Sequence, residues 1–61
     1  MLTVMRSEVE GQTYRLANLG YSRGFAIQIK QGKRYETVEM LGWITEAQAR
    51  AFFHKFCGME E

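Results

Sequence analysis

The chain has 61 residues and a formal net charge of +1, and its 46% hydrophobic and 13% aromatic residues argue against a disordered protein. A chain of this length forms one small domain, residues 1–61, and it has no apolar run long enough to cross a membrane. One cysteine excludes an internal disulfide, and glutamates near the N-terminus do not fit a signal peptide. We therefore expect a cytoplasmic protein.

The small net charge hides an uneven distribution along the chain. Residues 11–35 contain no acidic residue but several basic ones, so this segment is a positive block. Its basic residues are Arg15, Arg23, Lys30, Lys33 and Arg34. Glutamates near the two ends cancel most of this charge in the total only. A positive block of this kind suits a surface that meets phosphates.

The N-terminal half of the chain predicts strands. Residues 1–10 are either an extra edge strand or a loosely held arm, and Gly11 and Gln12 predict a turn before a strand over residues 13–19. Residues 20–24, with a glycine at each end, predict a loop. Residues 25–30 alternate strictly between apolar and polar side chains, which predicts a second strand with one buried face.

A third strand, residues 35–41, follows a turn whose length decides the register. A four-residue loop over residues 31–34 pairs Ile27 with Val38 and Phe25 with Met40, whereas a two-residue Gln-Gly loop would set Ile27 against Glu36 on the buried face. We prefer the longer loop. The core face then carries Phe25, Ile27, Ile29, Val38 and Met40, and the opposite face carries Arg15, Gln28, Lys30, Tyr35 and Thr37, with Glu39 as its one acid.

Residues 46–57 predict a helix with a clear start, stripe and end. Thr45 and Gln48 have the spacing of a capping box, and Gly58 suits the left-handed residue after a helix. An apolar stripe at helical spacing is expected to pack on the sheet: Ala49, Phe52, Phe53 and Phe56. We expect Trp43 to pack over the corner between sheet and helix; an exposed Trp43 would instead indicate an interface anchor.

These elements predict an α+β fold. A three-stranded antiparallel sheet over residues 12–41, with residues 1–10 as a possible extra edge strand, packs one face on a C-terminal helix over residues 45–57. The other face of the sheet is open. Its cations, amide and hydroxyls are the groups that bind phosphates and base edges, although the same residues could form a merely solvated face.

The segment 20–56 combines a glycine-bounded loop, an alternating strand, a basic turn, a strand that ends in Leu41-Gly42 and a helix that opens at Thr45. In letters these are GYSRGFAIQI, GKRY and LGWITEAQARAFF. This outline resembles the three-stranded DNA-binding domains of AP2-type transcription factors and of the N-terminal, arm-type regions of phage and transposon integrases. In that family the sheet lies in the major groove, which implies binding roles for Arg15, Arg23, Gln28, Lys30 and Tyr35. No integrase activity is implied, because no catalytic domain accompanies the helix.

Catalysis and metal binding are not expected. His54 and Cys57 lie three residues apart on the predicted helix, but no third ligand or orienting carboxylate is spaced to join them. Cys57 is better explained as a small apolar residue at the end of the helix. We therefore predict no enzyme, no metal and no cofactor.

The predicted function is a small DNA-binding or regulatory domain, of the size common among phage and prophage regulators. The residues predicted to meet duplex DNA are Arg15, Arg23, Gln28, Lys30, Lys33, Arg34 and Tyr35. The alternative is a protein-interaction module, either a homodimer or an inhibitor that docks on a larger protein. A cationic surface free of Glu36 and Glu39 would favour nucleic acid, whereas an apolar patch on that surface or along an edge strand would favour a protein partner.

Overall fold

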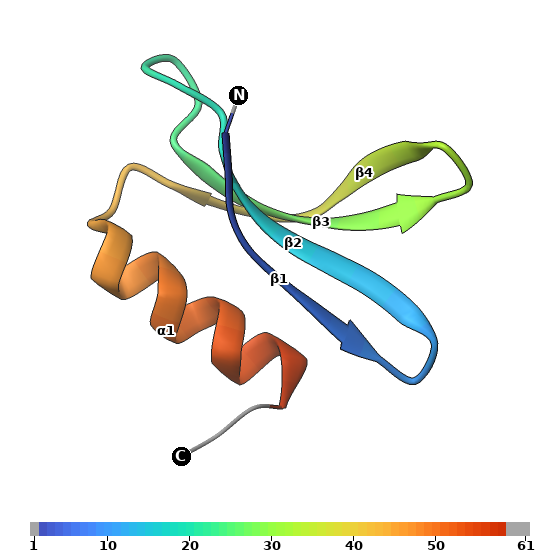
Figure 1. Ribbon diagram of the computed structural model, residues 1–61. Helices are drawn as coiled ribbons and strands as arrows, with labels where there is room; N and C mark the ends of the chain where they lie inside the picture. The colour runs from blue at the N-terminus through green and yellow to red at the C-terminus, as the bar shows by residue number, and fades with distance from the viewer. Residues whose placement is uncertain (1, 59–61) are drawn as a thin grey trace.

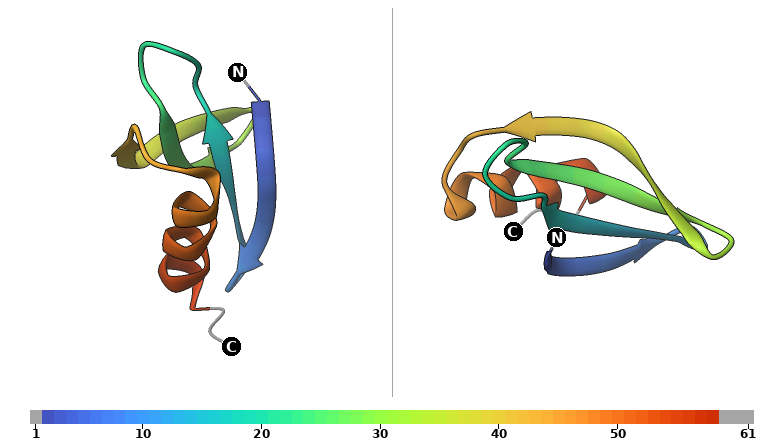
Figure 2. Two further views of the ribbon diagram at one scale, coloured as in Figure 1. Left: turned by 90° about the vertical axis from the view of Figure 1, so that its left-hand side faces the viewer. Right: turned by 90° about the horizontal axis from the view of Figure 1, so that it is seen from above.

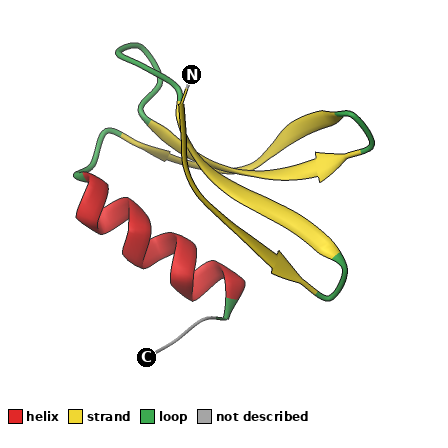
Figure 3. Ribbon diagram, in the orientation of Figure 1, coloured by secondary structure: helices red, strands yellow, loops and turns green. Residues whose placement is uncertain are grey.

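The computed structural model describes residues 2–58, which form four antiparallel strands followed by one helix (Figures 1 and 3). The strands are β1 (Leu2–Val9), β2 (Gln12–Asn18), β3 (Phe25–Gln31) and β4 (Arg34–Gly42), and the helix is α1 (Glu46–Cys57). Neighbours in the chain are neighbours in the sheet, in the order β1-β2-β3-β4. The α+β class is confirmed, and the segment that could have been an arm supplies an edge strand.

The helix lies on one face of the sheet and leaves the other face without a covering element (Figure 2). It packs mainly against β1 and β2, while the tip of the β3–β4 hairpin extends away from it (Figure 1). We call the face toward α1 the helix side and the opposite one the open face.

The β1–β2 turn lies one residue earlier than predicted. Val9 pairs with Gln12, so the turn residues are Glu10 and Gly11, with φ of 51° and 82°. Positive φ at both central positions is the type I′ arrangement, whose twist matches that of the flanking strands. Glu10 has a positive φ despite its side chain, a strain that the two flanking strands impose.

The predicted β3–β4 register is correct near the turn and wrong beyond it. Lys30 pairs with Tyr35 and Gln28 with Thr37, as predicted, but Gln31 also pairs with Arg34, which shortens the loop to two residues. The register then shifts, so that Ile27 pairs with Glu39 and Ala26 with Met40. Val38 is the extra residue of a β-bulge, a feature that alternation along the chain does not reveal.

This bulge removes two residues from the predicted core. Val38 and Met40 are exposed, whereas Leu16, Phe25 and Ile27 are buried. The core cluster lies between β2, β3 and α1 and has the members Leu16, Phe25, Ile27, Ala49, Phe53 and Cys57. Val4, Met5 and Val9 of β1 pack against it, which explains why β1 is part of the fold.

Helix α1 begins and ends as predicted. The Thr45 hydroxyl accepts the Gln48 N–H at 3.1 Å, and the Gln48 side chain accepts the Thr45 N–H at 3.1 Å, which completes a capping box. Gly58 ends the helix in the left-handed conformation, and its N–H reaches the carbonyls of His54 and Lys55.

The buried side of α1 differs from the prediction. It consists of Ala49, Phe53 and Cys57, whereas Phe52 is 53% exposed and Phe56 is 45% exposed. The reason is that α1 lies over β1 and β2, so a stripe at i, i+4 and i+8 points into the core. Phe52 and Phe56 therefore lie on the flank of α1 that is turned toward β4. The Phe56 ring still meets the Tyr14 ring edge-on, with centroids 5.4 Å apart.

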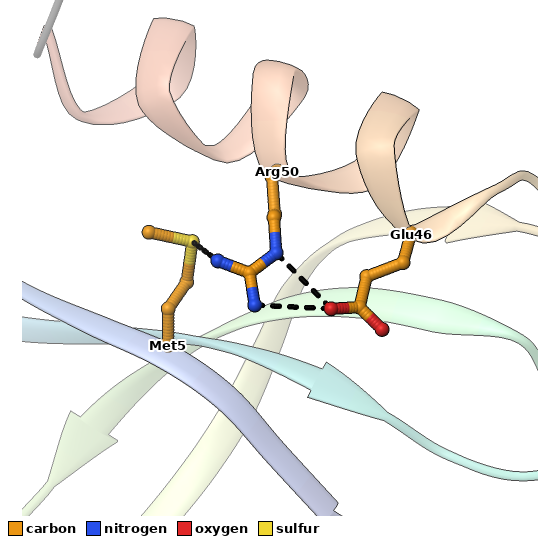
Figure 4. A network of polar contacts seen from close by, with 3 residues as sticks. All are labelled: Met5, Glu46 and Arg50. Carbon is orange, nitrogen blue, oxygen red and sulfur yellow. Dashed lines mark hydrogen bonds and ion pairs between the residues drawn. The ribbon is translucent and has the colours of Figure 1, made fainter.

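Polar contacts tie the first turns of α1 to the edge strand β1. The Arg50 guanidinium forms an i, i+4 ion pair with Glu46 at 3.0 Å, and its other terminal nitrogen lies 4.0 Å from the Met5 sulfur (Figure 4). The pair is exposed, so its contribution to stability is small, about 0.3–0.5 kcal/mol. The contact between Arg50 and Met5 shows that the flank of α1 bearing Arg50 is the one turned toward β1.

Candidate nucleic-acid interface

Four of the predicted site residues share the open face. Arg15 pairs with Gln28 across β2 and β3, and Lys30 pairs with Tyr35 across β3 and β4. Because opposed residues of an antiparallel pair lie on the same face, the register places all four together. Thr37, opposite Gln28, joins them as predicted.

Gln28 is the centre of a hydrogen-bond network on this face. Its side-chain oxygen accepts the Arg15 Nε–H at 2.8 Å, and its amide nitrogen donates to the Thr37 hydroxyl at 3.2 Å. Gln28 is only 7% exposed, so a buried amide is satisfied at both ends. Gln28 thus holds the Arg15 side chain in place.

The Arg15 guanidinium is held from a second side by an aromatic ring. Its central carbon lies 3.6 Å from the centroid of the Tyr35 ring, a cation–π contact, and one terminal nitrogen lies 3.4 Å from the Thr3 hydroxyl. A guanidinium fixed by an amide and a ring loses less conformational freedom when it meets an anion. The Tyr35 ring thus helps to fix the position of the Arg15 guanidinium.

Two acids that counted against nucleic-acid binding lie on the helix side. Glu36 pairs with Ile29, and Glu39 pairs with Ile27, whose side chain is in the core. Glu39 was predicted on the open face; this was wrong, because the Val38 bulge changes the alternation along β4. Glu8, which pairs with Thr13, is an acid of β1 that remains on the open face.

The remaining predicted cations do not gather in one place. Arg23 is exposed in the loop before β3, whereas Lys33 and Arg34 are exposed at the hairpin that follows β3. The seven residues of β3 separate these two groups by about 20 Å, at about 3.3 Å per residue. The structure thus places Arg15 in the middle of the sheet, Lys30 one pair before the β3–β4 turn, and Arg23 at the opposite end of β3 from Lys33 and Arg34.

Arg6 is a cation of this face that the sequence analysis did not select. It is exposed on β1 and directly opposite Arg15. The signal for it was weak, because its role depended on residues 1–10 forming a strand and on the register of that strand. Once β1 is present, Arg6, Arg15 and Lys30 form a group that we call the cationic centre.

Trp43 was expected to pack over the corner between sheet and helix, but it does not. It is 62% exposed, and its ring lies 6.4 Å from that of the exposed Tyr21. The two rings border a shallow hollow of about 290 Å³ with Asn18 and Gly20. Leu41 and Ile44, on either side of Gly42-Trp43, pack on the core instead.

Cys57 and Ser7 meet where the end of α1 lies over β1. The thiol is buried, and burial raises its pKa above the usual 9.0, while a hydrogen bond with the Ser7 side chain opposes this rise. A raised pKa is the opposite of what a nucleophilic thiolate requires. Within residues 2–58 no three metal-binding side chains form a group, and no helix there is long and apolar enough to span a membrane.

Comparisons with protein-family models, with curated proteins and with solved structures found no match to this chain. The resemblance to AP2-type and integrase N-terminal domains thus remains a prediction from the sequence.

Proposed function

We propose that this chain is a small DNA-binding domain without enzymatic activity and that it meets duplex DNA with the open face of its sheet. The observation that carries the proposal is that Arg6, Arg15 and Lys30 share one face of the sheet, from which Glu36 and Glu39 are turned away. Cations gathered on one face attract the phosphates of a duplex.

The arrangement of donors supports duplex DNA as the ligand. Arg15 is presented flat against the sheet by Gln28 and Tyr35, and Lys30 lies beside it on the same face. Antiparallel strands can enter the major groove, where a guanidinium reads guanine and phosphates lie on both sides. Arg23 at one end of β3 and Lys33 at the other would contact phosphates further along the duplex.

The test is the salt dependence of binding to an arbitrary labelled duplex, measured by fluorescence anisotropy between about 50 and about 200 mM salt. The variants are Arg6→Ala and Lys30→Ala, because both residues are exposed and neither supports the core. Each is expected to weaken binding and to reduce the salt slope by about one. Arg50→Ala, an equal loss of charge at an exposed position of α1, is the matched control and should change neither.

No binding by the parent at low salt would refute the proposal. Equal effects of Arg50→Ala and Lys30→Ala would also refute it, because they would indicate non-specific attraction without a preferred face.

The alternative role, contact with a protein, is favoured by a separate observation. Apolar side chains of β4 and of the adjacent flank of α1 are exposed beside one another, and monomeric proteins rarely leave such residues contiguous: Met40, Phe52 and Phe56. The DNA-binding role and the protein-binding role would use opposite sides of the sheet.

A further inference from the structure

A groove runs along the helix side between β4 and α1, where the helix leaves the sheet uncovered. Its volume is about 390 Å³, and its walls include Ile27, Leu41, Phe52 and Phe56. Phe52 and Phe56 are each about half exposed, and apolar side chains are stabilised when they leave water. A partner that covered the groove would therefore gain from burying both rings.

The shape of this surface is that of a ridge between two hollows. Phe52 and Lys55 border the groove on one side and also border a second hollow of about 300 Å³ on the other, together with Gln48 and Ala51. Helices pack by placing such ridges into the hollows of a neighbour. A surface that has both features can therefore fit a rotated copy of itself.

The charges at the rim of the groove are opposite in sign. Glu39 lies on the β4 side and Lys55 on the α1 side, and within residues 2–58 neither takes part in an ion pair. A two-fold axis that passes between the two grooves would bring the helix rim of one copy against the strand rim of the other. Lys55 of each protomer would then meet Glu39 of its partner, twice per dimer.

Pairing through the edge of β4 is a less suitable way to join two copies. The register of β4 against β3 shifts twice, between Phe25 and Ala26 and between Ile27 and Gln28. Bulges bend an edge strand and interrupt its row of free hydrogen-bonding groups, which hinders strand addition. The side chains of the groove, rather than the backbone of the edge, are thus the contact surface.

We propose that the groove between β4 and α1 is a two-fold homodimer interface, in which Phe52 and Phe56 of each protomer enter the groove of the other and Glu39 faces Lys55 across the axis. The inference does not depend on DNA binding, because it uses the side of the sheet opposite the cationic centre. A dimer also relieves the thin core of so short a chain.

The first measurement is the mass of the full chain in solution by sedimentation equilibrium over a range of protein concentrations. The expected result is a mass approaching twice 7.1 kDa as concentration rises. Phe52→Gln should raise the dimer dissociation constant at least about tenfold, because it removes a central apolar contact. Leu2→Gln, which replaces an exposed apolar residue on β1, is the control and should leave the constant unchanged.

The rim charges allow a sharper experiment that leaves the core untouched. Glu39→Lys and Lys55→Glu each create two like-charge contacts per homodimer, so each variant alone should dimerise more weakly than the parent. In a mixture of the two variants, both contacts of the heterodimer again join opposite charges. Native mass spectrometry should therefore show more heterodimer than random association gives.

A monomer at every concentration would overturn the proposal. So would a dimer that Phe52→Gln leaves as tight as before, or a mixture of the two charge variants with only the random proportion of heterodimer. None of these outcomes bears on DNA binding, which Arg6→Ala and Lys30→Ala test separately.

Discussion

Gly24 lies where the β2–β3 loop approaches the end of β4. Its φ is +80°, and a Cβ added there would lie 2.2 Å from the Gly42 carbonyl oxygen, too close for any side chain. Gly20, at the other end of the loop, also has a positive φ but has nothing within 4 Å of such a Cβ. Substitutions at the two positions can therefore be compared to separate the effect of backbone strain from that of a steric clash.

We expect Gly24→Ala to lower the free energy of unfolding by at least about 2 kcal/mol, because the strands must move apart and a left-handed alanine is strained. Gly20→Ala should cost only about 1 kcal/mol, from the backbone conformation alone. Urea unfolding followed by circular dichroism measures both. Equal losses for the two variants would contradict the close contact between Gly24 and Gly42.

Cys57 gives the molecule a pH-dependent stability. Because the thiol pKa is raised in the folded protein, the folded state holds this proton more firmly than the unfolded state. The stabilisation is complete below the unfolded value near 9.0 and is lost as pH rises through the folded value. We expect the free energy of unfolding to fall above about pH 9, and to fall less steeply in Cys57→Ala. Parallel curves for the two proteins would show that this thiol does not titrate differently on folding.

At the scale of the helix, neighbouring phenylalanines have opposite environments. Phe53 is fully buried in the core, whereas the Phe52 side chain lies at the rim of the groove. We expect Phe53→Ala to cost about 3–5 kcal/mol, which is most of the stability of a domain this small. Phe52→Ala should cost clearly less at concentrations where the protein is monomeric. Thermal unfolding of both variants tests this, and a larger effect at Phe52 would mean that α1 is rotated about its axis.

At the scale of the whole molecule, β1 decides whether the sheet and helix form a closed core. Helix α1 packs on β1 and β2, and Val4, Met5 and Val9 contact the core cluster. We expect deletion of residues 1–10 to unfold the chain, because the deletion removes one wall of the core and exposes Leu16 and Phe53 to water. Loss of chemical-shift dispersion in the proton NMR spectrum would show that the shortened chain is unfolded. A well-dispersed spectrum after the deletion would mean that residues 1–10 are an arm that the fold does not need.

Short-range patterns in the chain were sufficient to predict most of the elements. The strand over residues 25–30, the Thr45–Gln48 box and Gly58 each depend on neighbours a few residues away, and all three are present as predicted. The single buried face expected of that strand is not, because Ala26 and Gln28 are buried as well. The grouping of Arg15, Gln28, Lys30 and Tyr35 also followed, because the register near the β3–β4 turn depends on local pairing.

The sequence by itself determined three of the four strands, the helix ends and the open face of the sheet, because these depend on backbone geometry repeated every two residues in strands or about every four in a helix. Tertiary structure alone decided the Val38 bulge, the burial of Phe53 in place of Phe52 and Phe56, the exposure of Trp43, and the position of Arg6 opposite Arg15. Each of these depends on contacts between segments far apart in the chain, and those contacts follow from how whole surfaces pack together rather than from any local pattern.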